Sequence, residues 1–187
     1  IARLCADGRS APDRQDLVAP TTVAGRGGIG KTTTAAEVCR DPRVRARFPD
    51  GVLWVTVGES AGGAELAGKI NDLGAQLSGR RPLFTDPEQA GHHVGQLLAD
   101  KRCLLVVDDV GRASQLGPFL LGSGPQCRRL VTTRVRAALP DAADPVVVNA
   151  VSHAQAWELL TDGLPGAAGQ DLAPLLARTG AWPVLLR

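Results

Sequence analysis

The sequence has little of several features that would assign a protein to a class at once. Its 187 residues carry a formal net charge of only +2, which is too small to argue for a nucleic-acid or membrane surface. The basic residues are scattered, and we expect no direct contact with nucleic acid. No apolar run approaches the roughly 20 residues that a membrane-spanning helix needs, and no charged-then-apolar leader opens the chain. We therefore expect a cytoplasmic protein without a membrane partner.

Cysteine, histidine and lysine are also scarce. The four cysteines lie far apart without CxxC spacing, which argues against a metal site and favours isolated small apolar side chains. The three histidines lie in polar helical contexts, and we assign them no catalytic role. Only three of the 21 basic residues are lysines, so the position of Lys31 inside a glycine-rich loop is conspicuous. Because the chain opens on Ile1, we expect it to be part of a longer protein.

Apolar strands alternate with helical segments along most of the chain. Strands are predicted at 21–24, 52–57, 103–107, 129–132 and 146–148, and helices at 32–40, 64–77, 87–100, 113–116, 152–160 and 172–178. The alternation indicates an α/β sheet with crossover helices. After Ser152 only helices are predicted, which places a domain boundary near residue 150.

A glycine-rich loop is the most informative motif. Residues 25–32, GRGGIGKT, fit GxxxxGK[ST] and lie between a predicted strand and a predicted helix. Glycines let the backbone take positive φ and approach an anion closely, and the following helix adds its positive end. Lys31 can reach the β- and γ-phosphates, and the Thr32 hydroxyl can bind Mg²⁺. The predicted nucleotide-binding residues of this loop are Gly27, Gly28, Ile29, Gly30, Lys31, Thr32 and Thr33.

An acidic pair follows the predicted strand at 103–107. In P-loop proteins a carboxylate at this place holds Mg²⁺, usually through water, and Asp108 takes that role here. Asp109 is then placed to orient or activate the attacking water. Thr32 and Asp108 are therefore the predicted magnesium ligands, and a solvated strand-end turn is the weaker interpretation.

The fourth predicted strand ends in two hydroxyls and a guanidinium. Residues 129–134 read RLVTTR, and beside the glycine loop Arg134 can donate to a γ-phosphate and so report whether ATP or ADP is bound. The candidate catalytic residues are thus Lys31, Asp108, Asp109 and Arg134.

Other classes of P-loop protein compete for the same loop. A GTPase is unsupported, because residues 108–111 fit DxxG but no NKxD segment follows. The partition-type ATPases stay open, because residues 27–34 are close to their KGGxGKTTT loop, with Arg26 in place of the signature lysine. A module that binds nucleotide without hydrolysis is a third interpretation, which the intact Lys31, Thr32 and Asp108 disfavour.

Taken together, the segments GRGGIGKTTTA, LLVVDDV and RLVTTR resemble the NB-ARC nucleotide-binding module of STAND ATPases. This signal-transducing class includes plant resistance proteins, apoptosome scaffolds and actinobacterial regulators. Residues 48–55 resemble the segment that enters the family's second strand, and residues 180–186 resemble its GLPL motif. The second similarity implies that Pro183 lies against the nucleotide.

The resemblance implies a P-loop NTPase fold with a five-stranded parallel sheet flanked by helices. The loop strand would lie between the fifth and fourth strands, which brings Arg134 next to Lys31. We expect a connector at 1–19, a nucleotide-binding domain at 20–150 and the truncated start of a helical domain at 151–187. The expected function is an ATP/ADP switch with slow, Mg²⁺-dependent hydrolysis. Its expected partners are an adenine nucleotide, flanking sensor and effector domains, and further copies in a nucleotide-dependent homo-oligomer.

Overall fold

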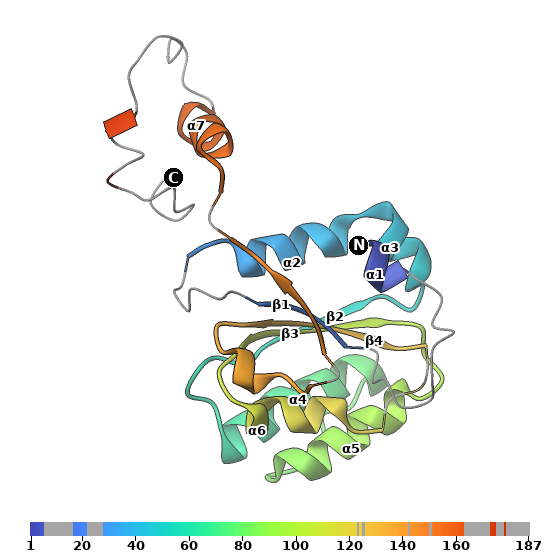
Figure 1. Cartoon of the computed structure of the whole chain (residues 1–187). Helices are drawn as coiled ribbons and strands as arrows, with labels where there is room; N and C mark the ends of the chain where they lie inside the picture. The colour runs from blue at the N-terminus through green and yellow to red at the C-terminus, as the bar shows by residue number, and fades with distance from the viewer. Residues whose placement is uncertain are drawn as a thin grey trace.

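A parallel β-sheet forms the centre of the chain. The computed structural model describes residues 1–5, 17–21, 28–122, 124, 126–141, 143–149, 151–162, 173–174 and 178. The strands lie in the order β2-β3-β4-β1-β5, and neighbouring strands are parallel (Figure 1). Their bounds are β1 (Leu17–Thr21), β2 (Val52–Thr56), β3 (Leu104–Val110), β4 (Arg128–Thr133) and β5 (Asp144–Val147). The predicted α/β class is confirmed, and β1 lies between β4 and β5 as the resemblance implies.

Helices cover both faces of the sheet (Figure 1). One face carries α1 (Ala2–Cys5), α2 (Lys31–Arg40) and α3 (Pro42–Arg47). The other carries α4 (Gly63–Ser78), α5 (Pro87–Leu98), α6 (Ala113–Leu116) and the 3-10 turn η1 (Gly117–Leu120). A second turn, η2 (Arg136–Ala138), follows β4, and α7 (His153–Thr161) follows β5 outside both layers. No helix among the described residues is long and apolar enough to cross a membrane.

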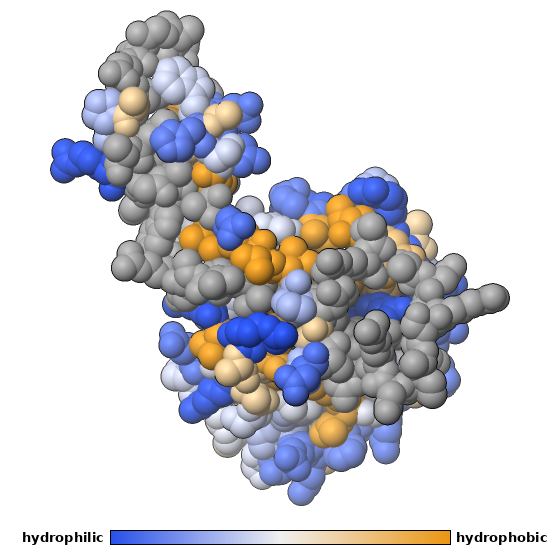
Figure 2. All heavy atoms as spheres, in the orientation of Figure 1, coloured by the Kyte–Doolittle hydropathy of each residue, from blue (hydrophilic) through white to orange (hydrophobic). Residues whose placement is uncertain are grey.

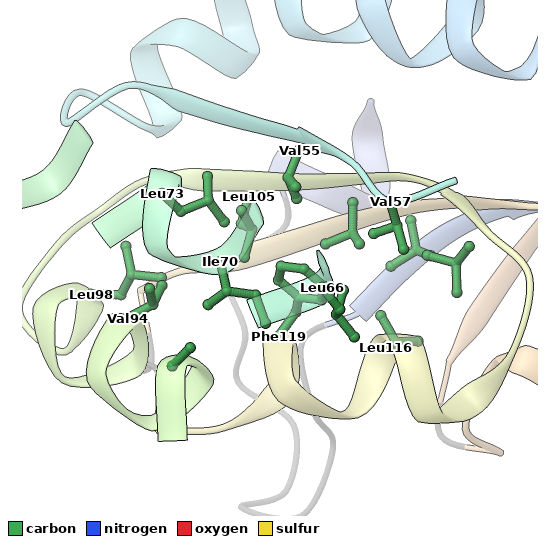
Figure 3. Packing of buried hydrophobic residues seen from close by; sticks show 14 of the residues in the cluster. Val55, Val57, Leu66, Ile70, Leu73, Val94, Leu98, Leu105, Leu116 and Phe119 are labelled. Atoms are coloured by element: carbon green, nitrogen blue, oxygen red, sulfur yellow. The ribbon is translucent and has the colours of Figure 1, made fainter. Parts of the chain in front are cut away.

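Side-chain alternation along β3 builds two cores, one on each face. Leu104 and Val106 pack with Phe48 and its neighbours on the side of α1, α2 and α3. Leu105 and Val107 belong to the larger cluster on the side of α4 and α5, part of which is drawn in Figure 3. That cluster also contains the helix residues Leu66, Ile70, Leu73, Val94 and Leu98. Because both faces are covered, β3 stays apolar until it reaches the acidic pair at the carboxyl edge of the sheet.

The first strand and one helix differ from the sequence prediction. β1 spans Leu17–Thr21 and not 21–24, so the sheet begins inside the segment predicted as a connector. Pro20 disfavours a strand locally, but β1 pairs on both sides, with β4 and β5, and this pairing overrides the local signal. Helix α3 was not predicted, because a proline such as Pro42 is a typical signal for the end of the preceding helix. Asp41 caps α3 by accepting from the Arg43 amide at 2.8 Å, so Pro42 ends one helix and opens the next.

The third and fifth strands also differ from their predicted bounds. β3 continues through the acidic pair to Val110, and β5 runs from Asp144 to Val147 rather than over 146–148. β5 lies at the edge of the sheet. Figure 2 shows apolar side chains on the surface of the molecule in the view of Figure 1. Val146 and Val147 are 40% and 44% exposed. Burial therefore does not confine the apolar residues to the paired part of β5, and the apolar run 146–148 is a poor guide to the bounds of the strand. Of the helix predicted at 172–178, only residues 173, 174 and 178 are described, and they are helical.

Gly91 and Gly95 allow α5 to approach the backbone of η1 and of Leu121, the residue after it. A Cβ atom on Gly95 would lie 2.2 Å from the Leu121 carbonyl oxygen, whereas one on Gly68 in α4 would meet nothing nearer than Arg81 Nη2 at 3.9 Å. We expect Gly95→Ala to lower the free energy of unfolding by about 1–3 kcal/mol through overpacking. Gly68→Ala is the matched control and should raise that free energy by up to about 1 kcal/mol, since alanine is the better helix former. Urea unfolding measures both, and equal effects would contradict the close approach.

Candidate nucleotide-binding site

The glycine loop ends at the amino end of α2. Gly28 and Gly30 have φ of 86° and 93°, values that favour glycine, and Gly30 is the residue before the helix. The first turn of any helix leaves amide groups without an intrahelical acceptor, and they carry the positive end of the helix dipole. These amides are available to an anion, and the nucleotide-binding role of Gly28, Ile29, Gly30, Thr32 and Thr33 stays a prediction.

Lys31 is a buried cation at the start of α2. The residue is 7% exposed, and its ammonium makes no hydrogen bond or ion pair with a side chain or backbone group in the described ranges. Burial lowers the pKa of its ammonium, the nearby Arg134 guanidinium lowers it further, and Asp109 and Asp108 act in the opposite direction. A bound anion would favour the charged ammonium, so the electrostatics of this position suit a phosphate group.

Asp108 collects hydrogen bonds from three elements. Its Oδ1 accepts from Thr32 Oγ1 at 2.8 Å and from Thr132 Oγ1 at 2.7 Å, and its Oδ2 accepts from Thr56 Oγ1 at 3.4 Å. The donors come from α2, β4 and β2, while the carboxylate itself is 4% exposed at the end of β3. These bonds offset the cost of burying a carboxylate and tie the helix after the glycine loop to the sheet.

The Thr32 and Asp108 oxygens also fit a magnesium ion. Mg²⁺ takes hard oxygen ligands and is usually held in nucleotide sites by one or two protein groups plus phosphate and water. The hydroxyl and carboxylate oxygens 2.8 Å apart are such a pair. No cluster of three or more His, Cys, Asp or Glu side chains that could hold a metal alone occurs among the described residues. Phosphate and water oxygens would complete the ligands of an ion held by this pair.

A backbone irregularity directs the Asp109 side chain into the same site as Asp108. Successive residues of a regular strand point to opposite faces, but the pairing of β3 with β4 shifts register between Val107 and Val110. Asp109 has a φ of 58°, rare outside glycine, and its amide donates to Thr132 Oγ1 at 2.9 Å. Asp108 and Asp109 therefore line one cavity, and the strand continues beyond them.

Arg134 follows β4 and faces two carboxylates. Its Nη2 lies 3.4 Å from Asp109 Oδ1, and its Nη1 lies 3.9 Å from Glu59 Oε2. Its Nε is buried and has no hydrogen-bond partner among the described residues. The guanidinium thus keeps unused donor capacity beside the phosphate loop.

A buried glutamine holds the loop that carries Glu59. Gln115, 1% exposed in α6, donates from Nε2 to the carbonyl oxygens of Gly58, Glu59 and Ala61 at 3.0, 3.2 and 2.7 Å. Its Oε1 accepts from the amides of Gly111 and Arg112 at 2.8 and 3.2 Å. One side chain therefore joins the loops that follow β2 and β3, and it sets the backbone from which Glu59 reaches Arg134. Sequence reasoning did not find this role, because a glutamine in a short helix carries no local signal.

The glycine loop, the acidic pair and Arg134 line a cavity of about 920 Å³ at the carboxyl edge of the sheet. It contains every predicted site residue that the structure describes, namely Gly28, Ile29, Gly30, Lys31, Thr32, Thr33, Asp108, Asp109 and Arg134. Gly27 and Pro183 lie outside the described residues. The far wall was not predicted and is formed by Val148, Asn149, Val151, Gln155 and Leu159, with Thr34, Glu37 and Thr56 nearer the loop. The sequence could have predicted Thr56, because it is a hydroxyl residue at the end of a strand. The sequence could not have predicted the residues in and before α7, because their place in the cavity depends on how the chain continues after β5.

A glycine loop before a helix, a lysine at the helix start and a buried carboxylate at a strand end together define a P-loop nucleotide-binding domain. Residues 12–164 match the NB-ARC domain family, and the chain belongs to this family of STAND-class P-loop ATPases. This membership decides between the classes that the loop alone left open, and it implies an adenine nucleotide as the ligand.

Similar proteins agree with this assignment. The chain is 32% identical over 188 residues to "Regulatory protein AfsR" of Streptomyces griseus, a match covering 96% of this chain and 19% of that protein. It is 36% identical over 154 residues to "Apoptotic protease-activating factor 1" of Danio rerio, covering 74% and 12%. The crystal structure of a STAND protein with a tetratricopeptide repeat sensor from Pyrococcus horikoshii aligns with a TM-score of 0.58 at 16% identity, covering 91% and 26%, and supports the fold. The chain therefore spans about a fifth or less of the length of the two curated relatives.

The Thr132 hydroxyl offers a test of the Asp108 network. It is fully buried, donates to Asp108 and accepts from the Asp109 amide. Thr132→Val keeps the shape but removes both bonds, so we expect the free energy of unfolding to fall by about 1–3 kcal/mol in denaturant titration without nucleotide. Thr34→Val makes the same change at an exposed position of α2 and should stay within about 0.5 kcal/mol of the unmodified chain. Similar values for the two variants would exclude a structural role for the network.

Proposed function

We propose that the chain is the nucleotide-gated switch of a longer regulatory protein and holds ATP or ADP in this cavity. One observation carries the proposal: Lys31 and Arg134 bring two cations to the same cavity, and Arg134 contacts Asp109 there and also Glu59, two carboxylates that a γ-phosphate can replace. A diphosphate reaches Lys31 and the loop alone, whereas a triphosphate also offers oxygens to Arg134. The two nucleotides then differ in their contacts, which a switch requires.

The residues that would hold the nucleotide follow from the site. The loop amides and Lys31 would bind the phosphates, and Thr32 and Asp108 would hold Mg²⁺. When bound, Mg²⁺ neutralises charge on the phosphate oxygens. Gly27 and Pro183 join the proposed contacts on the strength of the sequence resemblance.

Slow hydrolysis is part of the proposal. Asp109 lines the cavity with a side chain that is 30% exposed, so it can accept a hydrogen bond from a water molecule there. Its contact with Arg134 at 3.4 Å competes with that role. Because Arg134 and a water molecule would compete for the Asp109 carboxylate, we expect hydrolysis to be slow. Slow hydrolysis suits an ATPase that resets a switch.

The segment after residue 150 is the proposed moving part. Val151, Gln155 and Leu159 line the same cavity as the phosphate loop, so a bound nucleotide would lie against α7. We assign the five strands to one nucleotide-binding domain, predicted at 20–150 and here beginning with Leu17, and residues 151–187 to the start of a helical domain. The two nucleotide states would shift the population of positions that this helical part takes.

The rest of the protein is proposed by analogy. Because the chain spans a small share of its relatives, we expect flanking sensor and effector domains and a nucleotide-dependent homo-oligomer. A cytoplasmic location also stays a prediction from the sequence.

Lys31→Ala tests nucleotide binding. Removing the buried ammonium should weaken ATP and ADP more than about a hundredfold in isothermal titration calorimetry, because the phosphates lose their main countercharge. Lys101→Ala is the control, since Lys101 precedes the amino end of β3, at the opposite edge of the sheet from the cavity. Undiminished affinity of Lys31→Ala for ATP and ADP would contradict the assignment of this cavity as the nucleotide site.

Arg134→Ala tests the switch itself. We expect ATP affinity to fall about tenfold to a hundredfold with little change for ADP, because only ATP offers a γ-phosphate to the guanidinium. Glu59→Gln should move the ratio the other way, since it removes one carboxylate that competes for Arg134. Arg136→Ala, an exposed arginine in η2, is the control and should change neither affinity.

An equal loss of ATP and ADP affinity in Arg134→Ala would contradict the proposed switch. Steady-state turnover on the order of 1 s⁻¹ or faster, without a change of oligomeric state, would instead favour an enzyme whose product is the point of the reaction.

A further inference from the structure

Two buried cysteines meet at the edge of the sheet opposite the nucleotide cavity. Cys103 and Cys127 directly precede β3 and β4, and their Sγ atoms lie 3.0 Å apart. They are 1% and 2% exposed, and both are free thiols. The Arg128 amide donates to the Cys103 carbonyl at 3.1 Å, so the two residues sit side by side at the start of the strand pairing. The nucleotide site uses neither of them.

A buried arginine accompanies the thiol pair. Arg129 lies two residues beyond Cys127, on the same face of β4, and is 7% exposed. Its Nε donates to the Phe119 carbonyl at 2.6 Å, while its Nη2 is buried without a partner in the described part of the chain. A buried guanidinium with spare donors favours a negative charge nearby, and a thiolate is the group available.

We propose that Cys103 and Cys127 form a redox-active dithiol that a small peroxide oxidises to an intramolecular disulfide. Paired residues of neighbouring strands have backbones about 4.8 Å apart, which lies within the range of about 4.4–6.8 Å between Cα atoms that disulfides span. Their burial selects a small oxidant over a bulky one. A structural metal ion would need about four ligands, and no group of three or more candidate ligands exists among the described residues.

The chemistry assigns different roles to the two sulfurs. The hydrogen bond between the two sulfurs and the charge of Arg129 lower the pKa of the Cys127 thiol against the effect of burial, whereas the same hydrogen bond and burial raise the pKa of Cys103. The Cys127 thiolate attacks a peroxide oxygen, the O–O bond breaks, and the sulfur becomes a sulfenic acid as hydroxide takes up the thiol proton to leave as water. The Cys103 sulfur then attacks the sulfenic sulfur, the S–O bond breaks, and a second water leaves with the Cys103 proton. Two thiols and one hydrogen peroxide give one disulfide and two waters.

Thiol counting and peptide mapping of the unmodified chain test the proposal. After treatment with hydrogen peroxide, the free thiols measured in denaturant should fall from four to two, with the half-buried Cys5 and Cys39 retained as internal controls. Trypsin cleaves after Arg102, Arg112 and Arg128, so each partner falls in its own peptide. The expected product is peptide 103–112 linked to peptide 113–128, two hydrogens lighter than their sum and separated by reductant.

Two variants assign the roles of the sulfurs. In Cys103→Ser, peroxide should form a sulfenic acid on Cys127 more than about tenfold faster than it forms one on Cys103 in Cys127→Ser, as measured by dimedone added together with denaturant. Neither variant should yield the linked peptide. Four remaining thiols in the unmodified chain, or loss of Cys5 and Cys39 before the pair, would overturn the proposal, and neither result depends on whether a variant folds.

Discussion

The hydrogen-bonded carboxylate of Asp108 is the interaction on which the site depends. A buried carboxylate is costly unless its oxygens are satisfied, and here the donors come from α2, β4 and β2. The residue proposed to bind magnesium therefore helps to hold α2 against the sheet, together with Ala35 in the core on that face. Any ligand that draws the Thr32 hydroxyl away from Asp108 changes a bond that also holds the helix. Binding and local structure are coupled at this one atom pair.

The bulge at Asp109 adds the second half of the site. A regular strand would have directed Asp109 into the opposite face, away from Asp108. The positive φ at Asp109 brings it into the cavity instead, where it meets Arg134, and Gln115 secures the loop from which Glu59 reaches the same guanidinium. Arg134 is thus shared between two carboxylates, neither of which binds it closely. Such weak, divided contacts suit the sensor role proposed for Arg134, because a phosphate can replace them.

The sequence predicted the cavity side chains that carry a known motif and missed those that only packing supplies. Lys31, Thr32, Asp108 and Arg134 are recognisable because P-loop proteins use such side chains at the ends of strands and at a helix start, and the structure places all four in one cavity. The strand at Leu17 was missed because pairing on both sides outweighs the local signal of Pro20. The bulge, the clamp by Gln115 and the α7 wall were missed because they arise from contacts between segments more than 20 residues apart. Local pattern cannot contain them.

The two ends of β3 and β4 carry different chemistry on one continuous ladder. Pairing runs in register from Leu104 with Arg128 to Val107 with Val131 and breaks only at the bulge. A bond between Cys103 and Cys127 would join the strands just before this ladder begins, where the backbones already lie side by side. It would restrict fraying at the amino edge, while the bulge between it and Arg134 absorbs any small change in strand position. Oxidation would therefore act first on the stability of the sheet and only weakly on the nucleotide site.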